Sequence, residues 1–276
     1  MYKIEKDKII IEDLKDFNVS QILDCGQIFR YSIIGNTALV YSQDKKATIK
    51  TQDKKAEIIT KDVDYFINFF DLKTDYSKIK NKLNKDKFLK PAITFGYGIR
   101  ILNNDAYEML VSFIISANNN ISRIKKSIDY LCTNFGKNMG EYFAFPTLNE
   151  LKKASVDDYC KAGLGYRAAQ MFETIQKLTE NDIQNLKQMP RDEQFKFLVS
   201  LKGIGEKVAN CIMLFGLGVK DVFPVDTWIN KVYNKLTNTN STDRKRITKE
   251  LTEKYGNLSG YAQQYVYYYF RENNIK

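Results

Sequence analysis

The spacing of apolar residues changes once along this chain of 276 residues, near Val63. Before that point, turn residues separate short alternating or apolar stretches, namely KIIIEDL, QIFRYSII, TALVYS, KATIKTQ and AEIIT. A period of two predicts strands, so residues 1–65 are expected to form an antiparallel sheet of about five strands. From Val63 onward the apolar residues recur at helical spacing nearly to the C-terminus, which predicts about eight to ten helices. The chain is therefore expected to have an α+β fold.

Pro91, Gly96 and Gly98 interrupt the helical pattern within KPAITFGYGIR, residues 90–100. Such residues favour a connector between domains. We therefore expect an N-terminal antiparallel β-sheet domain with short helices over residues 1–97. A mainly α-helical, two-lobed region is expected over residues 98–276, with a cleft between the parts.

The charge and the residue types narrow the chemistry. The formal net charge is +10, which favours a polyanion such as nucleic acid as partner, although a composition rich in Lys, Ile and Asn gives the same excess. There is no histidine, which excludes Ser-His and Cys-His catalysis. The four cysteines are scattered without Cys-x-x-Cys spacing, so neither a zinc site nor an iron–sulfur cluster is expected.

The location is predicted from what the sequence lacks. There is no apolar run of about 18 residues and no signal-peptide pattern at the N-terminus, so a cytoplasmic protein without a membrane partner is expected. In a bacterium it would associate with the nucleoid, and we expect a monomer.

The stretch LKGIGEKVANC, residues 201–211, predicts two helices joined by a tight turn, over about 193–216. Gly203 is expected to end the first helix with a positive φ, and Gly205 to allow close approach of another backbone. The amide groups at the start of the second helix then attract a phosphate, and such a hairpin binds the DNA backbone without reading its sequence. An ordinary αα-hairpin with a glycine turn is the alternative.

Lys207 is unusual because a cation in the first turn opposes the helix dipole. We expect this field and partial burial to lower the pKa of Lys207, which would make it a nucleophilic amine. Cys211, one turn later on the same face, is a candidate pocket wall. Asp226 is predicted to cap the helix TWINKVYNKL, and taken alone it needs no other role.

The order of these motifs is specific. GIGEK (203–207) followed by PVD (224–226) resembles the helix-hairpin-helix/Gly-Pro-Asp signature of a DNA glycosylase superfamily. In members with this lysine, the amine attacks C1′ of the damaged nucleotide, a Schiff base follows base loss, and β-elimination nicks the strand. The resemblance implies these roles for Lys207, with Asp226 assisting deprotonation and stabilising the positive charge that develops on the sugar.

Two motifs in the first half of the chain indicate the branch of the eukaryotic-type 8-oxoguanine DNA glycosylases. DCGQIFRY (24–31) is similar to the family's Gly-Gln-x-Phe-Arg segment, which implies that the Gly26 carbonyl accepts a hydrogen bond from N7–H of 8-oxoguanine. NNNISR (118–123) resembles the family's Asn-rich helix junction. The implied roles are that Asn118 fills the vacated base stack and that Arg123 reads the orphaned cytosine.

Two further motifs agree with this branch. GLGYRA (163–168) resembles the segment in which Tyr166 would be the wedge that kinks the DNA and Arg167 would bind the estranged cytosine. GYAQQYVYYYFR (260–271) resembles the helix that closes the pocket. Gln263 would meet the Watson–Crick edge of the flipped base, and Tyr267, where the family commonly has phenylalanine, would stack on it opposite Cys211.

The resemblance implies a bifunctional glycosylase and lyase that removes 8-oxoguanine, preferably opposite cytosine, from double-stranded DNA in base excision repair. No cofactor is implied, although the hairpin carbonyls can hold a structural cation. One departure is Trp228, where the family often has a histidine that contacts phosphate.

Three alternatives stay open. A superfamily glycosylase for adenine or thymine glycol usually has a C-terminal four-cysteine cluster, and this chain has no cysteine after Cys211. A glycosylase for alkylated bases lacks the hairpin lysine. A non-catalytic helix-hairpin-helix DNA-binding module would leave Lys207 and Asp226 without a joint purpose.

Overall fold

The computed structural model describes residues 2–273, and its N-terminal part is a six-stranded antiparallel sheet. The strands are β1 (Tyr2–Glu5), β2 (Lys8–Ile11), β3 (Tyr31–Ile34), β4 (Thr37–Ser42), β5 (Lys45–Gln52) and β6 (Lys55–Ile59), in the order β1-β2-β6-β5-β4-β3. The predicted antiparallel sheet is confirmed, but the prediction missed β1. That edge strand, YKIE, is mostly exposed, so it has no clear alternation of apolar and polar residues.

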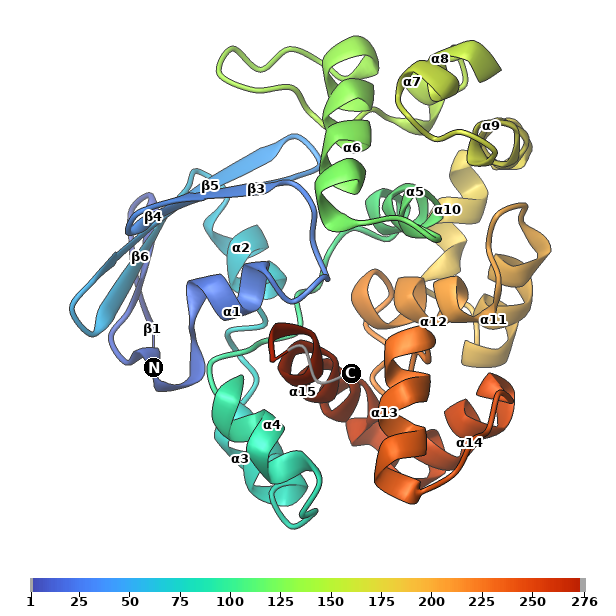
Figure 1. The fold of residues 1–276 in the computed structure, drawn as a ribbon. Coiled ribbons are helices and arrows are strands. Elements are labelled where there is room, and N and C mark those ends of the chain that lie inside the picture. The colour runs from blue at the N-terminus through green and yellow to red at the C-terminus, as the bar shows by residue number, and fades with distance from the viewer. Residues whose placement is uncertain (1, 274–276) are drawn as a thin grey trace.

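One face of the sheet is buried. Side chains alternate along β4 between buried and partly exposed. Val40 of β4 and Ile49 of the adjacent strand β5 are almost inaccessible to solvent. Helix α2 (Val63–Phe69) contributes two phenylalanines and an isoleucine to the apolar cluster on this face, and the phenylalanine that follows the helix joins them. In Figure 1, α1 (Val19–Leu23) and α2 lie between the sheet and the other helices. A short 3-10 helix, η1 (Leu14–Asp16), precedes α1.

The rest of the described chain is mainly helical, as predicted. The helices are α3 (Tyr76–Leu83), α4 (Leu89–Phe95), α5 (Ala106–Ser116), α6 (Ile121–Phe135), α7 (Leu148–Leu151), α8 (Val156–Lys161), α9 (Arg167–Lys177), α10 (Glu180–Leu186), α11 (Arg191–Ser200), α12 (Glu206–Phe215), α13 (Thr227–Thr237), α14 (Arg244–Tyr255), the 3-10 helix η2 (Gly256–Leu258) and α15 (Ser259–Glu272). The predicted number of eight to ten was too low. Helices as short as α7, which Thr147 begins with a capping box, show no apolar period of their own.

The stretch 90–100 is only partly a connector. Its first half belongs to α4, with Pro91 as the third residue, where the missing N–H has no partner within the helix. Gly98 is needed for close packing, because a Cβ there would lie 2.3 Å from Cβ of Asn18. The interpretation of residues 90–95 as a linker is therefore wrong, and the domain division near residue 97 stays a prediction.

The described part of the chain has two large apolar clusters, one under the sheet and one among the helices. Cys25 and Phe29 precede β3 in sequence, yet they belong to the helical cluster. The loop between α1 and β3 is therefore inserted into the helical part. None of the helices within residues 2–273 combines the length and the apolar character that a membrane span requires.

A polar seam also joins the sheet to the helices. The Gln43 backbone N–H, at the β4–β5 turn, donates to the buried Glu108 carboxyl of α5 at 2.7 Å, and Gln43 Nε2 donates to Asp105 at 2.7 Å. The Arg30 guanidinium lies 3.6 Å from Glu108. Burial raises the pKa of Glu108 to about 7, against the opposing effect of Arg30.

Candidate active site

The hairpin formed by α11 and α12 has the predicted geometry. Gly203 has a φ of +79°, which confirms the expected left-handed conformation, and Gly205 precedes α12 as its N-cap residue. A Cβ on Gly205 would meet no atom within 4 Å, so the backbone there is open to an approaching group. Lys207 is the second residue of α12 and is partly buried.

Asp226 caps α13, as predicted. Its Oδ1 accepts a hydrogen bond of 2.8 Å from the backbone N–H of Ile229. The preceding Phe223 and Val225 are buried, which fixes the chain on the way into the helix. One carboxylate oxygen is therefore held by the helix, while the other makes no hydrogen bond within residues 2–273 and is free for chemistry.

A single cavity of about 50 Å³ brings the predicted catalytic and base-binding residues together. It is lined by Lys207, Asp226, Gly26, Cys211, Gln263 and Tyr267, along with Cys25, Phe113, Phe215, Pro224 and Gln264. The predicted residues come from α12, α13, α15 and the α1–β3 loop, so they are far apart in sequence. Their proximity is a property of the fold, and their roles stay predictions.

Phe113 of α5 was not predicted as part of this site. Its ring centroid lies 5.8 Å from Lys207 Nζ, and the ring stacks on Phe215 at 5.7 Å. The aromatic ring replaces water beside the ammonium group and stabilises the cation through its π-electrons. A phenylalanine in an apolar helix resembles any other core residue, so no sequence pattern distinguishes it.

The charge state of Lys207 differs from the prediction. Burial acts to lower the pKa of this amine, but negative charge on Cys211 and Asp226 raises it, and the balance lies above the usual lysine value. Burial also raises the pKa of the Cys211 thiol, against the opposing effect of the Lys207 charge. The prediction of a depressed lysine pKa is therefore wrong for the DNA-free site, because the effects of Cys211 and Asp226 together outweigh burial.

The Gly26 loop is clamped on both sides. Gly26 has a φ of +80°, a conformation that favours glycine. The buried Gln27 donates from Nε2 to the carbonyl groups of Ile22 and Arg100, and its Oε1 accepts from Leu102 N–H. Gln264 of α15 donates to the Cys25 carbonyl at 2.6 Å. Gln264 was not predicted, and adjacent glutamines on a helix give no indication of which one faces the loop.

Tyr267 closes the cavity. A Cβ built on Gly26 would lie 3.2 Å from Tyr267 Cε1 and 3.4 Å from its hydroxyl oxygen, so the ring covers Gly26. Arg271, one turn later on α15, donates to the Asp24 carbonyl and holds this end of the helix on the loop. Because a water molecule occupies about 30 Å³ of the liquid, the cavity has no room for a purine until Tyr267 moves. The Gln263 Oε1 is buried and unpartnered, so it is available to a ligand donor.

Apart from the two hairpin glycines, the predicted DNA-contacting residues lie at two helix junctions. Asn118 and Arg123 are exposed at the α5–α6 junction, where Asn118 has a positive φ of 49°. Tyr166 is 64% exposed at the start of α9. Arg167 is different, because it is buried and its Nη1 donates to the Ala117 carbonyl at 2.9 Å. In this state Arg167 joins the two loops, and its contact with cytosine stays a prediction that requires it to leave this position.

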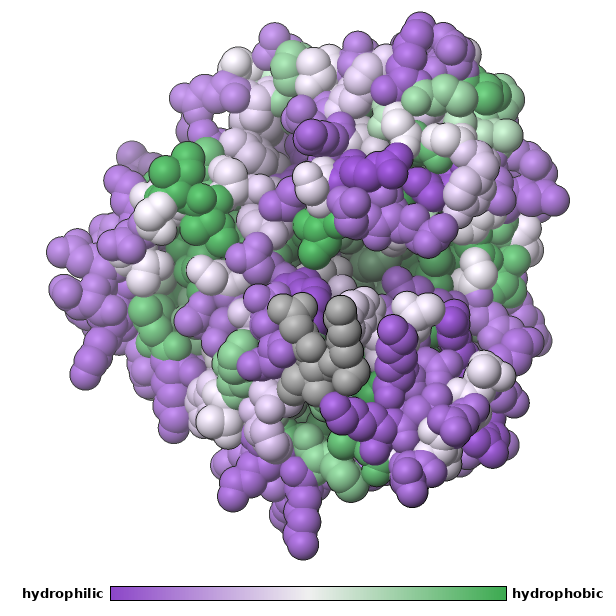
Figure 2. All heavy atoms as spheres, viewed as in Figure 1, coloured by the Kyte–Doolittle hydropathy of each residue, from purple (hydrophilic) through white to green (hydrophobic). Residues whose placement is uncertain are grey.

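Trp228 lies in the first turn of α13 and is partly buried. The Lys231 ammonium group lies 5.6 Å from the centroid of the Trp228 ring. A cation is thus present beside the position where the family often has a histidine. Hydrophilic residues cover much of the face shown in Figure 2, and apolar residues show in separate patches at its left, its upper right and its middle.

Comparison with known protein families gives two matches that together span most of the chain. Residues 9–110 match the 8-oxoguanine DNA glycosylase N-terminal domain. Residues 111–257 match the HhH-GPD superfamily of base excision DNA repair proteins. The second match alone covers more than half of the chain.

Individual relatives agree. The chain is 31% identical over 219 residues to the N-glycosylase/DNA lyase OGG1 of Arabidopsis thaliana, covering 73% of this chain and 58% of that protein. It is 36% identical over 179 residues to the N-glycosylase/DNA lyase of Saccharomyces cerevisiae, covering 58% of this chain and 47% of that protein. The matched part thus spans only about half the length of these two relatives.

A solved structure matches over almost its full length. The Clostridium acetobutylicum 8-oxoguanine glycosylase/lyase, in complex with double-stranded DNA containing cytosine opposite 8-oxoG, aligns with a TM-score of 0.92 and 36% identity. The alignment covers 100% of this chain and 99% of that one.

Proposed function

Since this chain belongs to the HhH-GPD superfamily of base excision DNA repair proteins, in the OGG1-type branch, we propose that it excises 8-oxoguanine from double-stranded DNA and then nicks the strand. The observation that carries the proposal is the single cavity that gathers Lys207, Asp226, Gly26 and Gln263 from separate elements. The name of the clostridial relative, a glycosylase/lyase bound to DNA with this lesion opposite cytosine, supports the same substrate.

Base recognition rests on complementary hydrogen bonds. In 8-oxoguanine N7 carries a hydrogen, whereas in guanine N7 is an acceptor, so the Gly26 carbonyl attracts the first and repels the second. The unpartnered Gln263 Oε1 accepts from the Watson–Crick edge. Tyr267 moves off Gly26 and stacks on the base, with Cys211 on the opposite face. The hydrogen bonds of Gln27 and Gln264 keep the Gly26 carbonyl in place while Tyr267 moves and the base enters.

The chemistry then depends on deprotonation of Lys207. The raised pKa means that the amine is an ammonium group near pH 7 in the DNA-free enzyme, so it must transfer a proton before attack. The Asp226 carboxylate accepts this proton or stabilises the positive charge that develops on the sugar. The Lys207 nitrogen bonds to C1′ as the bond from C1′ to the base breaks, and the departing base takes up a proton. Opening of the sugar ring at the C1′–O4′ bond then gives the Schiff base, and β-elimination breaks the C3′–O bond of the strand. No cofactor takes part in this scheme, and a cation on the hairpin carbonyls is proposed only as structural.

Borohydride trapping tests the proposal. The labelled duplex carries one 8-oxoguanine opposite cytosine, with guanine in place of the lesion as the substrate control. We expect a covalent adduct with the lesion only, and none with Lys207→Gln. Lys177→Gln, which changes an exposed lysine at the end of α9, is the matched variant and should leave trapping unchanged. Duplexes with adenine, guanine or thymine opposite the lesion measure the preference for cytosine.

Two results would contradict the proposal in different ways. Tight binding without an adduct would mean that Lys207 is structural and that the protein is a DNA-binding module. An adduct with a different damaged base, but not with 8-oxoguanine, would keep the mechanism and replace the substrate.

A further inference from the structure

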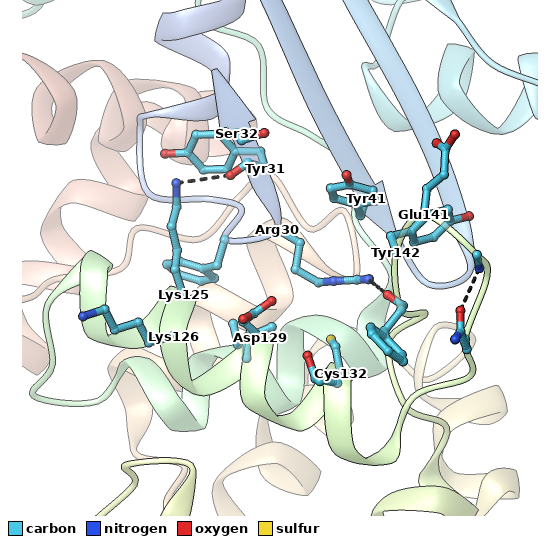
Figure 3. Close-up of a pocket in the computed structure, with 16 residues that line it drawn as sticks. Arg30, Tyr31, Ser32, Tyr41, Lys125, Lys126, Asp129, Cys132, Glu141 and Tyr142 are labelled. Atoms are coloured by element: carbon cyan, nitrogen blue, oxygen red, sulfur yellow. Dashed lines mark hydrogen bonds between the residues drawn. The ribbon is translucent and has the colours of Figure 1, made fainter. Parts of the chain in front are cut away.

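A second, larger cavity lies between the sheet and α6, and no step of the proposed reaction uses it. Its volume is about 600 Å³, within the range of small-molecule sites and far above the 50 Å³ at Lys207. The two cavities share no lining residue. Figure 3 shows side chains from β3, β4, α6 and the loop that contains Tyr142 directed toward this space.

The walls are aromatic and the floor is apolar. Tyr31, Tyr41 and Tyr142 contribute rings, and the Tyr41 and Tyr142 centroids lie 5.0 Å apart. The buried side chains of Ile128 and Cys132 form part of the floor. Flat aromatic walls around an apolar floor suit a planar ring, which can stack on the tyrosines regardless of its sequence context.

Two side chains of opposite charge on α6 line this space, and they do not pair with each other. Lys125 and Asp129 are four residues apart on α6, a spacing at which side chains can form an ion pair. Instead, Lys125 Nζ lies 3.3 Å from the centroid of the Tyr31 ring and 3.5 Å from the Tyr31 carbonyl oxygen. Asp129 forms no hydrogen bond or ion pair with any residue in 2–273, and Figure 3 shows its carboxylate in the cavity below Arg30. The Asp129 carboxylate is therefore available to a ligand, and Lys125 becomes available when its ammonium group leaves Tyr31.

Arg30 does not compete for that carboxylate. Its Nη1 donates to the Gln43 carbonyl at 3.1 Å and its Nη2 to the Phe143 carbonyl at 2.7 Å, and Glu108 lies beside it. Lys126, next to Lys125, is exposed at the rim and has no ion-pair partner within the described residues. The cavity thus offers the exposed Asp129 carboxylate, since its other carboxylate, Glu141, is paired with Lys46, and ammonium groups on one side.

We propose that this cavity binds a guanine nucleotide. A carboxylate accepts two parallel hydrogen bonds from N1–H and the N2 amino group of guanine, a pair of donors that adenine lacks. The purine stacks on the Tyr31 ring as Lys125 leaves that ring, and Lys125 with Lys126 then neutralises the phosphate. The nucleotide is either free or a guanosine in single-stranded DNA, since α6 begins at the predicted DNA-contacting junction around Asn118.

The test is titration calorimetry on the full DNA-free chain with GMP and AMP as probes. We expect GMP to bind at least tenfold more tightly than AMP. Asp129→Asn should remove that preference, because an amide offers only one acceptor atom to the two donors. Lys125→Met should weaken both nucleotides and leave guanosine, which has no phosphate, unchanged. Asp157→Asn, on the exposed face of α8, is the matched control and should have no effect.

The source of the nucleotide is tested with a single-stranded DNA pentamer that has a central guanosine. Tighter binding of the pentamer than of GMP, lost in Asp129→Asn, would identify DNA as the source. Equal binding of GMP and AMP, or no GMP binding at millimolar concentration, would overturn the proposal. Loss of GMP binding in Gln263→Leu but not in Asp129→Asn would overturn it as well, because the nucleotide would then occupy the catalytic cavity. None of these outcomes depends on glycosylase activity, so they do not test the proposed excision.

Discussion

The base-binding cavity and the DNA-contacting loops are built from different parts of the chain. The cavity needs the α1–β3 loop with Gly26 and the helices with Lys207, Asp226 and Gln263. The predicted DNA contacts all lie between Asn118 and Gly205, within the helical part. Recognition of the lesion should therefore depend on how the sheet part docks on the helices, whereas binding of the DNA backbone should not. Four predictions test this difference, from the largest effect to the smallest.

Removing the Asp226 charge should separate chemistry from binding. In Asp226→Asn the amide oxygen can still accept from Ile229 N–H, so the helix cap is retained while the charge is lost. We expect single-turnover excision to fall by about 10³-fold, with duplex affinity unchanged. Asp243→Asn, which alters the equivalent cap of α14, should leave excision unchanged. A similar loss of duplex affinity in Asp226→Asn would show that the cavity also holds the DNA backbone.

The Glu108 seam should make docking of the sheet dependent on pH. The pKa of the Glu108 carboxyl is raised from 4.5 to about 7 in the folded protein, so folding favours the protonated form. The stabilisation is complete below pH 4.5 and is lost as the pH rises through about 7, which corresponds to about 3 kcal/mol. Urea denaturation should show this decrease between pH 5 and pH 8, a range in which the chain has no histidine to titrate.

Glu108→Gln isolates that contribution. The variant removes the titration, so the decrease in unfolding free energy over this pH range should shrink by about 3 kcal/mol. The exposed Glu253→Gln on α14 should leave the pH dependence as it is. An unchanged pH dependence in Glu108→Gln would mean that Arg30 keeps the carboxyl ionised throughout.

A methyl group on Gly26 should damage recognition of the lesion more than the fold. In Gly26→Ala the new Cβ lies 3.2 Å from the Tyr267 ring, at a positive φ that costs about 1–2 kcal/mol. We expect excision of 8-oxoguanine to fall about tenfold to thirtyfold, while binding to a duplex with an abasic-site analogue stays the same.

Gly35→Ala is the matched control for this variant. Gly35 also has a positive φ, of +57°, but a Cβ there meets no atom within 4 Å. Both variants should lower the melting temperature to a similar extent, and only Gly26→Ala should lose excision. Equal activities would mean that the Gly26 carbonyl does not contact the base.

The sequence predicted local features better than it predicted the environment of each side chain. The Gly203 turn and the Asp226 cap follow from rules that involve neighbouring residues, and both are present. The pKa of Lys207 was predicted wrongly because it depends on Cys211, one turn away on α12, and on Asp226, which is nineteen positions away in sequence but close in the fold. Burial of Arg167 under the Ala117 carbonyl likewise depends on packing between α9 and the α5–α6 loop.

Tyr166→Ala should have the smallest effect of the four variants, and it should weaken DNA binding in general and not recognition of the lesion. The side chain is 64% exposed, so the free energy of unfolding should change by less than about 0.5 kcal/mol. Loss of a ring that inserts beside a base should weaken binding about tenfold, and equally for duplexes with and without the lesion. Tyr166→Phe, measured by fluorescence anisotropy alongside it, should bind like the unmodified protein because the ring provides the wedge. Weaker binding in Tyr166→Ala for the 8-oxoguanine duplex alone would contradict the division proposed above, since a residue of the helical loops would then take part in reading the damaged base.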